Sequence, residues 1–132
     1  MAKAKKVKLL SALLPDRVGL LADVSELIAK AKVNINAICA YQSGEKAEFL
    51  IVTESASKTK KAIAGLGVEV KEEDAVCVEM PNKAGELAKA ARRIADAAVN
   101  ITYSWASTFT GKTSAWILKT SDNTKAVKAI NR

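Results

Sequence analysis

The chain repeats itself after 66 residues, and this internal repeat constrains its fold more than any other feature of the sequence. Residues 15–35 and 81–101 share ten identical positions in a window of 21, including an aligned Pro, Gly and Asn. Composition alone gives about two identities in a window of that length. A duplication therefore predicts two small units with the same fold, joined in one chain.

Each half begins with the pattern of a strand followed by an amphipathic helix. The apolar runs Val7–Leu14 and Ala75–Met80 both end at proline, which suits a strand that stops there. Apolar residues three and four apart then predict a helix. The residues expected on its buried face are Leu21, Val24, Ile28 and Ala31 in the first half and Leu87, Ala91, Ile94 and Ala98 in the second.

The rest of each half reads as two strands joined by a glycine turn, followed by a short helix. The first half places them at Asn34–Tyr41, Glu48–Thr53 and Lys58–Ala64, and the second at Asn100–Phe109, Thr113–Thr120 and Asn123–Ile130. Only the first half continues into a fourth strand, Val68–Lys71.

This order predicts the α+β fold class: two tandem ferredoxin-like βαββαβ units, the second lacking its last strand. We expect a basic N-terminal tail at residues 1–6, a first domain at 7–71 and a second at 75–132.

The missing strand leaves Ala75–Met80 as an open apolar edge, and such edges are normally covered. A strand from elsewhere, such as Val68–Lys71 or a segment of a second molecule, is expected to pair with it, unless the protein was cut short of its natural end. The first alternative implies a homo-oligomer or a rearranged strand order.

The positive charge of the chain concentrates at its start. Lysines at 3, 5, 6 and 8 stand without an acidic neighbour, and residues 9–132 then hold 17 basic against 14 acidic residues. A short lysine-rich tail is usually solvated. The expected third strands also offer only Phe49 and Trp116 as aromatic residues, whereas RNA-binding units of this strand order display several. We therefore do not expect nucleic-acid binding.

The residues needed for metal or catalytic chemistry are scarce. The chain has no histidine, and its two cysteines, Cys39 and Cys77, are isolated, so no metal site or cofactor is expected. No nucleophile–base pair and no phosphate-binding glycine loop is recognisable, which argues against an enzyme. No apolar run is long enough to cross a membrane, and the free cysteines favour the cytoplasm.

The loop between the first strand and first helix recurs in both halves, as Asp16-Arg17-Val18-Gly19 and Asn82-Lys83-Ala84-Gly85. Free N–H groups at a helix start attract a carboxylate, a glycine allows close approach, and an Asp or Asn can accept an ammonium group. These features suit a free amino acid. Asp16 and Asn82 could equally be helix N-caps.

With Leu21-Ala22 or Leu87-Ala88 after the loop, and Val33-Asn34-Ile35 or Val99-Asn100-Ile101 after the helix, each half resembles the ACT domain family. That family of amino-acid-sensing regulatory modules shows D/N-x-P-G-x-L-A in the loop and G/V-N-I before the second strand. Here Val18 and Ala84 replace the frequent proline.

The resemblance implies a non-catalytic sensor that binds a free amino acid at the interface of two ACT-like domains. The ligand-binding residues it implies are Asp16, Gly19, Asn34, Asn82, Gly85 and Asn100. Asn34 and Asn100 could instead end their helices in a left-handed turn. It also implies a homo-oligomer and a regulated metabolic enzyme or regulator on another polypeptide. The alternatives are a protein-interaction scaffold without ligand and a nucleic-acid-binding module.

Overall fold

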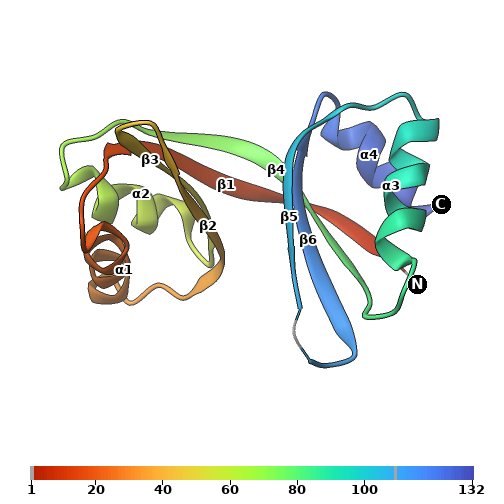
Figure 1. Cartoon of the computed structure of the whole chain (residues 1–132), viewed down its shortest axis with the longest axis horizontal. Helices are drawn as coiled ribbons and strands as arrows, with labels where there is room; N and C mark the ends of the chain where they lie inside the picture. The colour runs from red at the N-terminus through yellow and green to blue at the C-terminus, as the bar shows by residue number, and fades with distance from the viewer. Residues whose placement is uncertain (1, 109) are drawn as a thin grey trace. The chain divides into compact units, whose positions relative to one another are not determined.

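The computed structural model describes residues 2–108 and 110–132, which form two compact units. The first unit is Lys8–Glu73, and the second combines residues 2–7 with Asp74–Arg132. In each unit, two helices cover one face of an antiparallel sheet (Figure 1). The α+β, ferredoxin-like fold class predicted from the repeat is therefore confirmed.

The elements follow one another in the predicted order. They are β1 (Lys3–Pro15), α1 (Leu20–Lys30), β2 (Ile35–Ser43), β3 (Lys46–Thr53), α2 (Ala56–Ala64), β4 (Val70–Pro81), α3 (Glu86–Asp96), β5 (Ile101–Ser107), β6 (Thr113–Thr120) and α4 (Asn123–Asn131). Phe109, expected at the end of a strand, lies outside the described residues. No helix in the described part of the chain is long and apolar enough to cross a membrane.

Two long strands, β1 and β4, belong to both units. The strands lie in the order β2-β3-β1-β4-β6-β5. The first unit takes β2, β3, the end of β1 from Lys8 and the start of β4 up to Glu73. The second unit takes the start of β1, the end of β4 from Asp74, β6 and β5. Each unit thus has four strands, although the chain contains only six.

Two expectations about the chain's organisation need correction. Lys3–Lys6 are not a tail but the beginning of β1. A strand from elsewhere does pair with the edge at Ala75–Met80, as expected, but it is the start of β1 and not Val68–Lys71. No turn residue separates Lys71 from Ala75, so the chain continues straight through as one strand, β4.

The lysine-rich composition concealed the start of β1. Side chains alternate between the two faces of a strand, so a small apolar residue can pack into the core while its charged neighbours on either side point to the other face. Ala4 is that residue, with only 9% of its surface exposed, and it packs into the core of the second unit. The neighbouring lysines are exposed. The domain boundaries therefore differ from 7–71 and 75–132, since residues 2–7 complete the second unit.

The core of each unit lies between its helices and its sheet. In the first unit Val24 and Ile28 of α1 pack against Phe49 and Ile51 of β3. In the second unit, Ile94 of α3 packs against the apolar residues of β4 and β6, which include Val76, Val78, Trp116 and Leu118. Burying one such side chain contributes about 1.5–3 kcal/mol.

The buried face of each first helix differs from the expected one by a single position. Leu21 and Leu87 were expected to be buried, but 51% and 46% of their surfaces are exposed. Leu20 and Ala90 point inward instead, together with the correctly expected Val24, Ile28 and Ile94. Two exposed leucines are thereby left at corresponding positions of the two units.

An asparagine at the end of α4 fixes β1 in the second unit. The backbone N–H of Ala4 donates to Asn131 Oδ1 at 2.7 Å, and Asn131 Nδ2 donates to the Ala4 carbonyl at 2.9 Å. The side-chain amide thus satisfies both polar groups of a backbone position on the strand, as a neighbouring strand would.

Replacing Asn131 with Ala is expected to lower the free energy of unfolding of the second unit by about 1–3 kcal/mol, because two hydrogen bonds are lost. Urea denaturation followed by tryptophan fluorescence measures this, since both tryptophans, Trp105 and Trp116, lie in that unit. Lys128→Ala, on the exposed side of the same helix, is the control and should change little. Equal effects of the two substitutions would contradict the role of Asn131.

Candidate ligand-binding site

Each first helix begins immediately after a glycine in the left-handed conformation. Gly19 has φ +86° before α1, and Gly85 has φ +87° before α3. A Cβ at either position would meet no atom within 4 Å, so lack of space is not the reason for a glycine there. The backbone conformation does, because a side chain makes this region unfavourable by about 1–2 kcal/mol.

Asp16 and Asn82 fix the loop to the hairpin of their unit rather than capping the helix. Gln42 Nε2 donates to Asp16 Oδ2 at 2.9 Å, and Asn82 Nδ2 donates to the Gly111 carbonyl at 3.1 Å. Their backbone N–H groups donate to the Glu45 and Lys112 carbonyls at 3.0 and 2.8 Å. The interpretation of Asp16 and Asn82 as N-caps is therefore wrong: both stand three residues before the glycine.

The start of α1 consequently carries no side-chain cap. The Leu20 N–H reaches the Arg17 carbonyl at 3.3 Å, and the first full helical bond runs from the Asp23 N–H to the Gly19 carbonyl at 3.0 Å. The N–H groups of Leu21 and Ala22 lie between these two and have no acceptor within the helix. They contribute to the partial positive charge of the helix start.

A pocket of about 300 Å³ opens at this helix start in the first unit. One wall consists of the loop and the first turn of α1, with Asp16, Arg17 and Gly19. The other wall comes from β2 and β3 and includes Tyr41, Gln42 and Phe49, which lie outside the loop motif that predicted the site. An acidic group, a basic group and an uncapped helix start therefore border one cavity.

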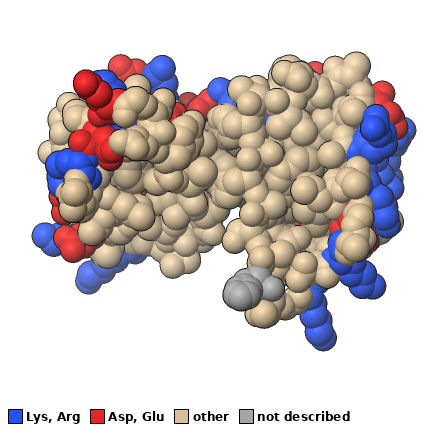
Figure 2. All heavy atoms as spheres, in the orientation of Figure 1, with Lys and Arg blue, Asp and Glu red and all other residues tan. Residues whose placement is uncertain are grey.

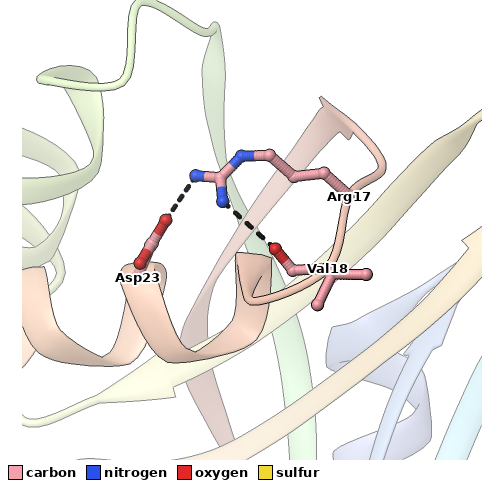
Figure 3. Close-up of polar contacts among 3 residues, drawn as sticks. All are labelled: Arg17, Val18 and Asp23. Atoms are coloured by element: carbon pink, nitrogen blue, oxygen red, sulfur yellow. Dashed lines mark hydrogen bonds and ion pairs between the residues drawn. The ribbon is translucent and has the colours of Figure 1, made fainter.

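Arg17 lies across the first turn of α1 (Figure 3). Its guanidinium forms an ion pair with Asp23, and its Nη1 donates to the Val18 carbonyl at 3.4 Å. About half of both charged side chains is exposed, so the pair contributes little to stability. Its effect is positional: it holds a positive charge beside the helix start.

The second unit has a pocket of about 230 Å³ at the equivalent place. Asn82, Lys83, Leu87 and Thr108 line it at positions that correspond to Asp16, Arg17, Leu21 and Gln42 after a shift of 66 residues. One difference changes its chemistry. Glu86 replaces Leu20, its side chain is only 18% exposed, and Lys89 Nζ lies 3.4 Å from its Oε1. Both helices thus have an acid in their first turn, Asp23 in α1 and Glu86 in α3, but Glu86 stands at the first helical position and lines the pocket, where it disfavours a second anion.

Asn34 and Asn100 do not join these pockets. Each follows the far end of an 11-residue helix, about 16 Å from the glycine by helix geometry. They do not end their helices in a left-handed turn either, since that conformation belongs to Lys32 and Ala98, with φ +58° and +59°. The Asn34 carbonyl accepts from the Glu54 N–H at 3.1 Å, and the Asn100 N–H donates to Ser121 Oγ at 3.0 Å.

Three large apolar side chains around the first pocket are exposed. Val18 is fully exposed, and Leu21 and Tyr41 are 51% and 52% exposed. Val18 stands at the tip of the loop, while Leu21 and Tyr41 line the two walls of the pocket. A patch of this kind around a polar cavity is typical of a surface that another molecule covers.

A separate pocket of about 290 Å³ in the first unit holds Glu48, Glu69 and Lys71. Burial raises the pKa of the Glu48 carboxyl above its ordinary value, and the nearby Glu73 raises it further, whereas Lys71 acts in the opposite direction. No group of three or more His, Cys, Asp or Glu side chains suited to a metal ion occurs among the described residues.

Glu48→Gln is expected to raise the free energy of unfolding at pH 7. An acid whose pKa is raised by folding stabilises the folded state below its unfolded pKa and loses that contribution as the pH rises through the folded pKa. The gain should therefore vanish at about pH 3, where Glu48 is protonated in both states. Urea denaturation at the two pH values measures it, and a gain that persists in acid would contradict the shift.

Gly19→Ala is expected to lower the free energy of unfolding by about 1–2 kcal/mol because of its positive φ. Gly65→Ala provides the control. Gly65 has φ −60°, and an added Cβ would lie 3.4 Å from the Ala62 carbonyl oxygen, so alanine fits there. Thermal denaturation of the two variants compares them, and equal stability would show that Gly19 is not required for the loop conformation.

Comparison with known proteins relates the first unit to a family. Residues 8–64 match the family profile of the ACT domain. No curated protein sequence matches the chain significantly. Among solved structures, a protein of Bacteroides thetaiotaomicron superposes with a TM-score of 0.87 at 24% identity, over 97% of this chain and 88% of that one.

Two aspartate kinase structures share the same fold. The regulatory subunit of aspartate kinase from Thermus thermophilus has a TM-score of 0.71 at 13% identity, with 98% of this chain and 94% of that chain covered. Clostridium acetobutylicum aspartate kinase has a TM-score of 0.67 at 18% identity, with 98% and 33% covered. The ACT family profile thus matches the first unit, and the resemblance inferred from the loop motif is confirmed there. Identities this low establish the common fold only.

Proposed function

We propose that the protein is a non-catalytic sensor whose first unit binds a free amino acid at the start of α1. The observation that supports this most directly is the pocket bordered by Asp16, Arg17 and the uncapped helix start. An α-amino acid carries one carboxylate and one ammonium group a few ångströms apart. The pocket presents a positive and a negative group on the same small cavity.

The proposed binding mode follows from these charges. The ligand carboxylate lies at the N–H groups of Leu21 and Ala22, where the helix start and the Arg17 guanidinium both favour an anion. The ammonium group lies at Asp16, whose second carboxylate oxygen remains available beside its bond to Gln42. The ligand side chain faces Tyr41 and Leu21, which favours an apolar or small amino acid.

The equivalent pocket of the second unit is proposed to bind an amino acid weakly or not at all. Asn82 supplies no negative charge for an ammonium group, and Glu86 occupies the helix start. Gly85 and Asn82 then serve the loop conformation only. Asn34 and Asn100, distant from both pockets within their units, are not part of the proposed contact set.

The exposed side chains Val18, Leu21 and Tyr41 support a covered pocket. We infer that a second ACT-type surface closes over the ligand, so that binding and assembly are coupled. A regulated partner protein on another polypeptide would bind the assembled form. The rival function is a scaffold that uses the same apolar surface to bind proteins and takes no ligand.

Binding is tested by thermal denaturation of the whole chain with each of the twenty amino acids. A ligand at 100 times its dissociation constant should stabilise the first unit by about 2.7 kcal/mol. Asp16→Asn keeps an acceptor for Gln42 but removes the charge, and should weaken binding by at least about tenfold. Glu45→Gln removes the same charge from an exposed side chain outside the pocket and should not.

The outcomes separate the two functions. A stabilising amino acid whose effect is lost in Asp16→Asn and kept in Glu45→Gln supports the sensor. No stabilisation by any amino acid at about 10 mM favours the scaffold instead.

A further inference from the structure

The net charge of the protein belongs entirely to one unit. The second unit contains 12 basic and 5 acidic residues, whereas the first contains nine of each. The whole formal charge of +7 therefore surrounds the second unit. On the face seen in Figure 2, basic side chains gather on the second unit, while basic and acidic ones are mixed on the first. Such a field raises the local concentration of anions.

The second unit also has a pocket of about 460 Å³, with two of its basic residues in the lining. Its lining includes Cys77 and Glu79, which alternate along β4 with residues packed against the helices. The pocket therefore opens on the face of the sheet opposite α3 and α4. Lys3 and Lys5 of β1 border it on one side, and Ser107 of β5 and Thr113 of β6 bring hydroxyl groups to the same face of the sheet.

The two lysines indicate that the pocket binds an anion. They are two residues apart on one strand, so they share a face with their Cα atoms about 7 Å apart. Neither forms an ion pair with any residue that the structure describes. Lys5 is close enough to Cys77, which lines the same cavity, to oppose the rise in its pKa that burial causes. Two lysines without an ion-pair partner among the described residues thus border one polar pocket.

We propose that this pocket is a binding site for a small dianion, held by Lys3 and Lys5 and hydrogen-bonded by the hydroxyl groups of the hairpin. A dicarboxylate and a phosphate monoester share this chemistry. Glu79 lines the same cavity and repels every anion, the more strongly the higher its charge, so it disfavours polyanions most. The site is separate from the pocket at α1, and its occupancy does not depend on the function proposed there.

Isothermal titration calorimetry on the whole chain tests the proposal with succinate and inorganic phosphate as dianions and acetate as the monoanion. Ionic strength is held at about 0.1 M, because screening otherwise changes with the ligand. A dianion should bind, and acetate should bind at least about tenfold more weakly. Comparing succinate with phosphate shows whether the site binds a dicarboxylate or a phosphate group.

Three variants identify the pocket. Lys3→Gln and Lys5→Gln should each weaken dianion binding about tenfold. Lys6→Gln is the matched control, since it removes the same charge from the same strand on the face opposite to Lys3 and Lys5. All three positions are exposed, so the fold should tolerate the changes. Glu79→Gln should strengthen binding because it removes the repulsion.

Several results would overturn the proposal. No heat from either dianion at about 10 mM would exclude the site. Equal losses in Lys6→Gln and Lys5→Gln would show general attraction to the charged unit rather than a pocket. Weaker dianion binding in Glu79→Gln would show that Glu79 supports the bound ligand instead of repelling it, which contradicts the proposed arrangement. Amino-acid binding at Asp16 should remain unchanged in all these variants, so failure of one site is distinguishable from failure of the other.

Discussion

The fold depends on the pairing of β1 with β4, because each of these strands supplies part of both units. A ferredoxin-like unit needs four strands, and two such units in separate segments would need eight. Here six strands suffice. The backbone groups along β4 must be hydrogen-bonded, since an unpaired apolar strand edge favours association with other chains. The start of β1 supplies that partner, and Asn131 fixes it in place.

The repeat predicted most of the fold, because both copies carry the same strong local patterns. Prolines end β1 and β4, glycines mark the hairpins, and apolar spacing locates the helices. The start of β1 was missed because its apolar contribution is one alanine among lysines. The buried face of α1 was displaced by one residue because Leu20 and Leu21 are chemically identical, and only packing decides which one turns inward.

The site was predicted in part for a related reason. Asp16 and Gly19 are three residues apart, so a single loop brings them together whatever the details of the fold. Asn34 lies beyond an intervening helix, and a shared motif could not tell which end of that helix it would occupy. Tyr41 and Gln42 reach the pocket only because the β2–β3 hairpin folds against the loop, a long-range contact without a local sequence signal. Most of the charge of the second unit is readable from the sequence, since residues 75–132 hold nine basic and four acidic residues, and the start of β1 adds the lysines at 3, 5 and 6.

The division of β1 between the units also sets an order of folding. The first unit is a continuous segment, Lys8–Glu73, so all of its contacts are available once that segment has left the ribosome. The second unit joins Ala4 to Asn131, partners 127 residues apart, and cannot close until the last helix has been synthesised. Contacts of such sequence separation form slowly. The C-terminal part of β1 can therefore join the sheet of the first unit before the second unit needs the N-terminal part.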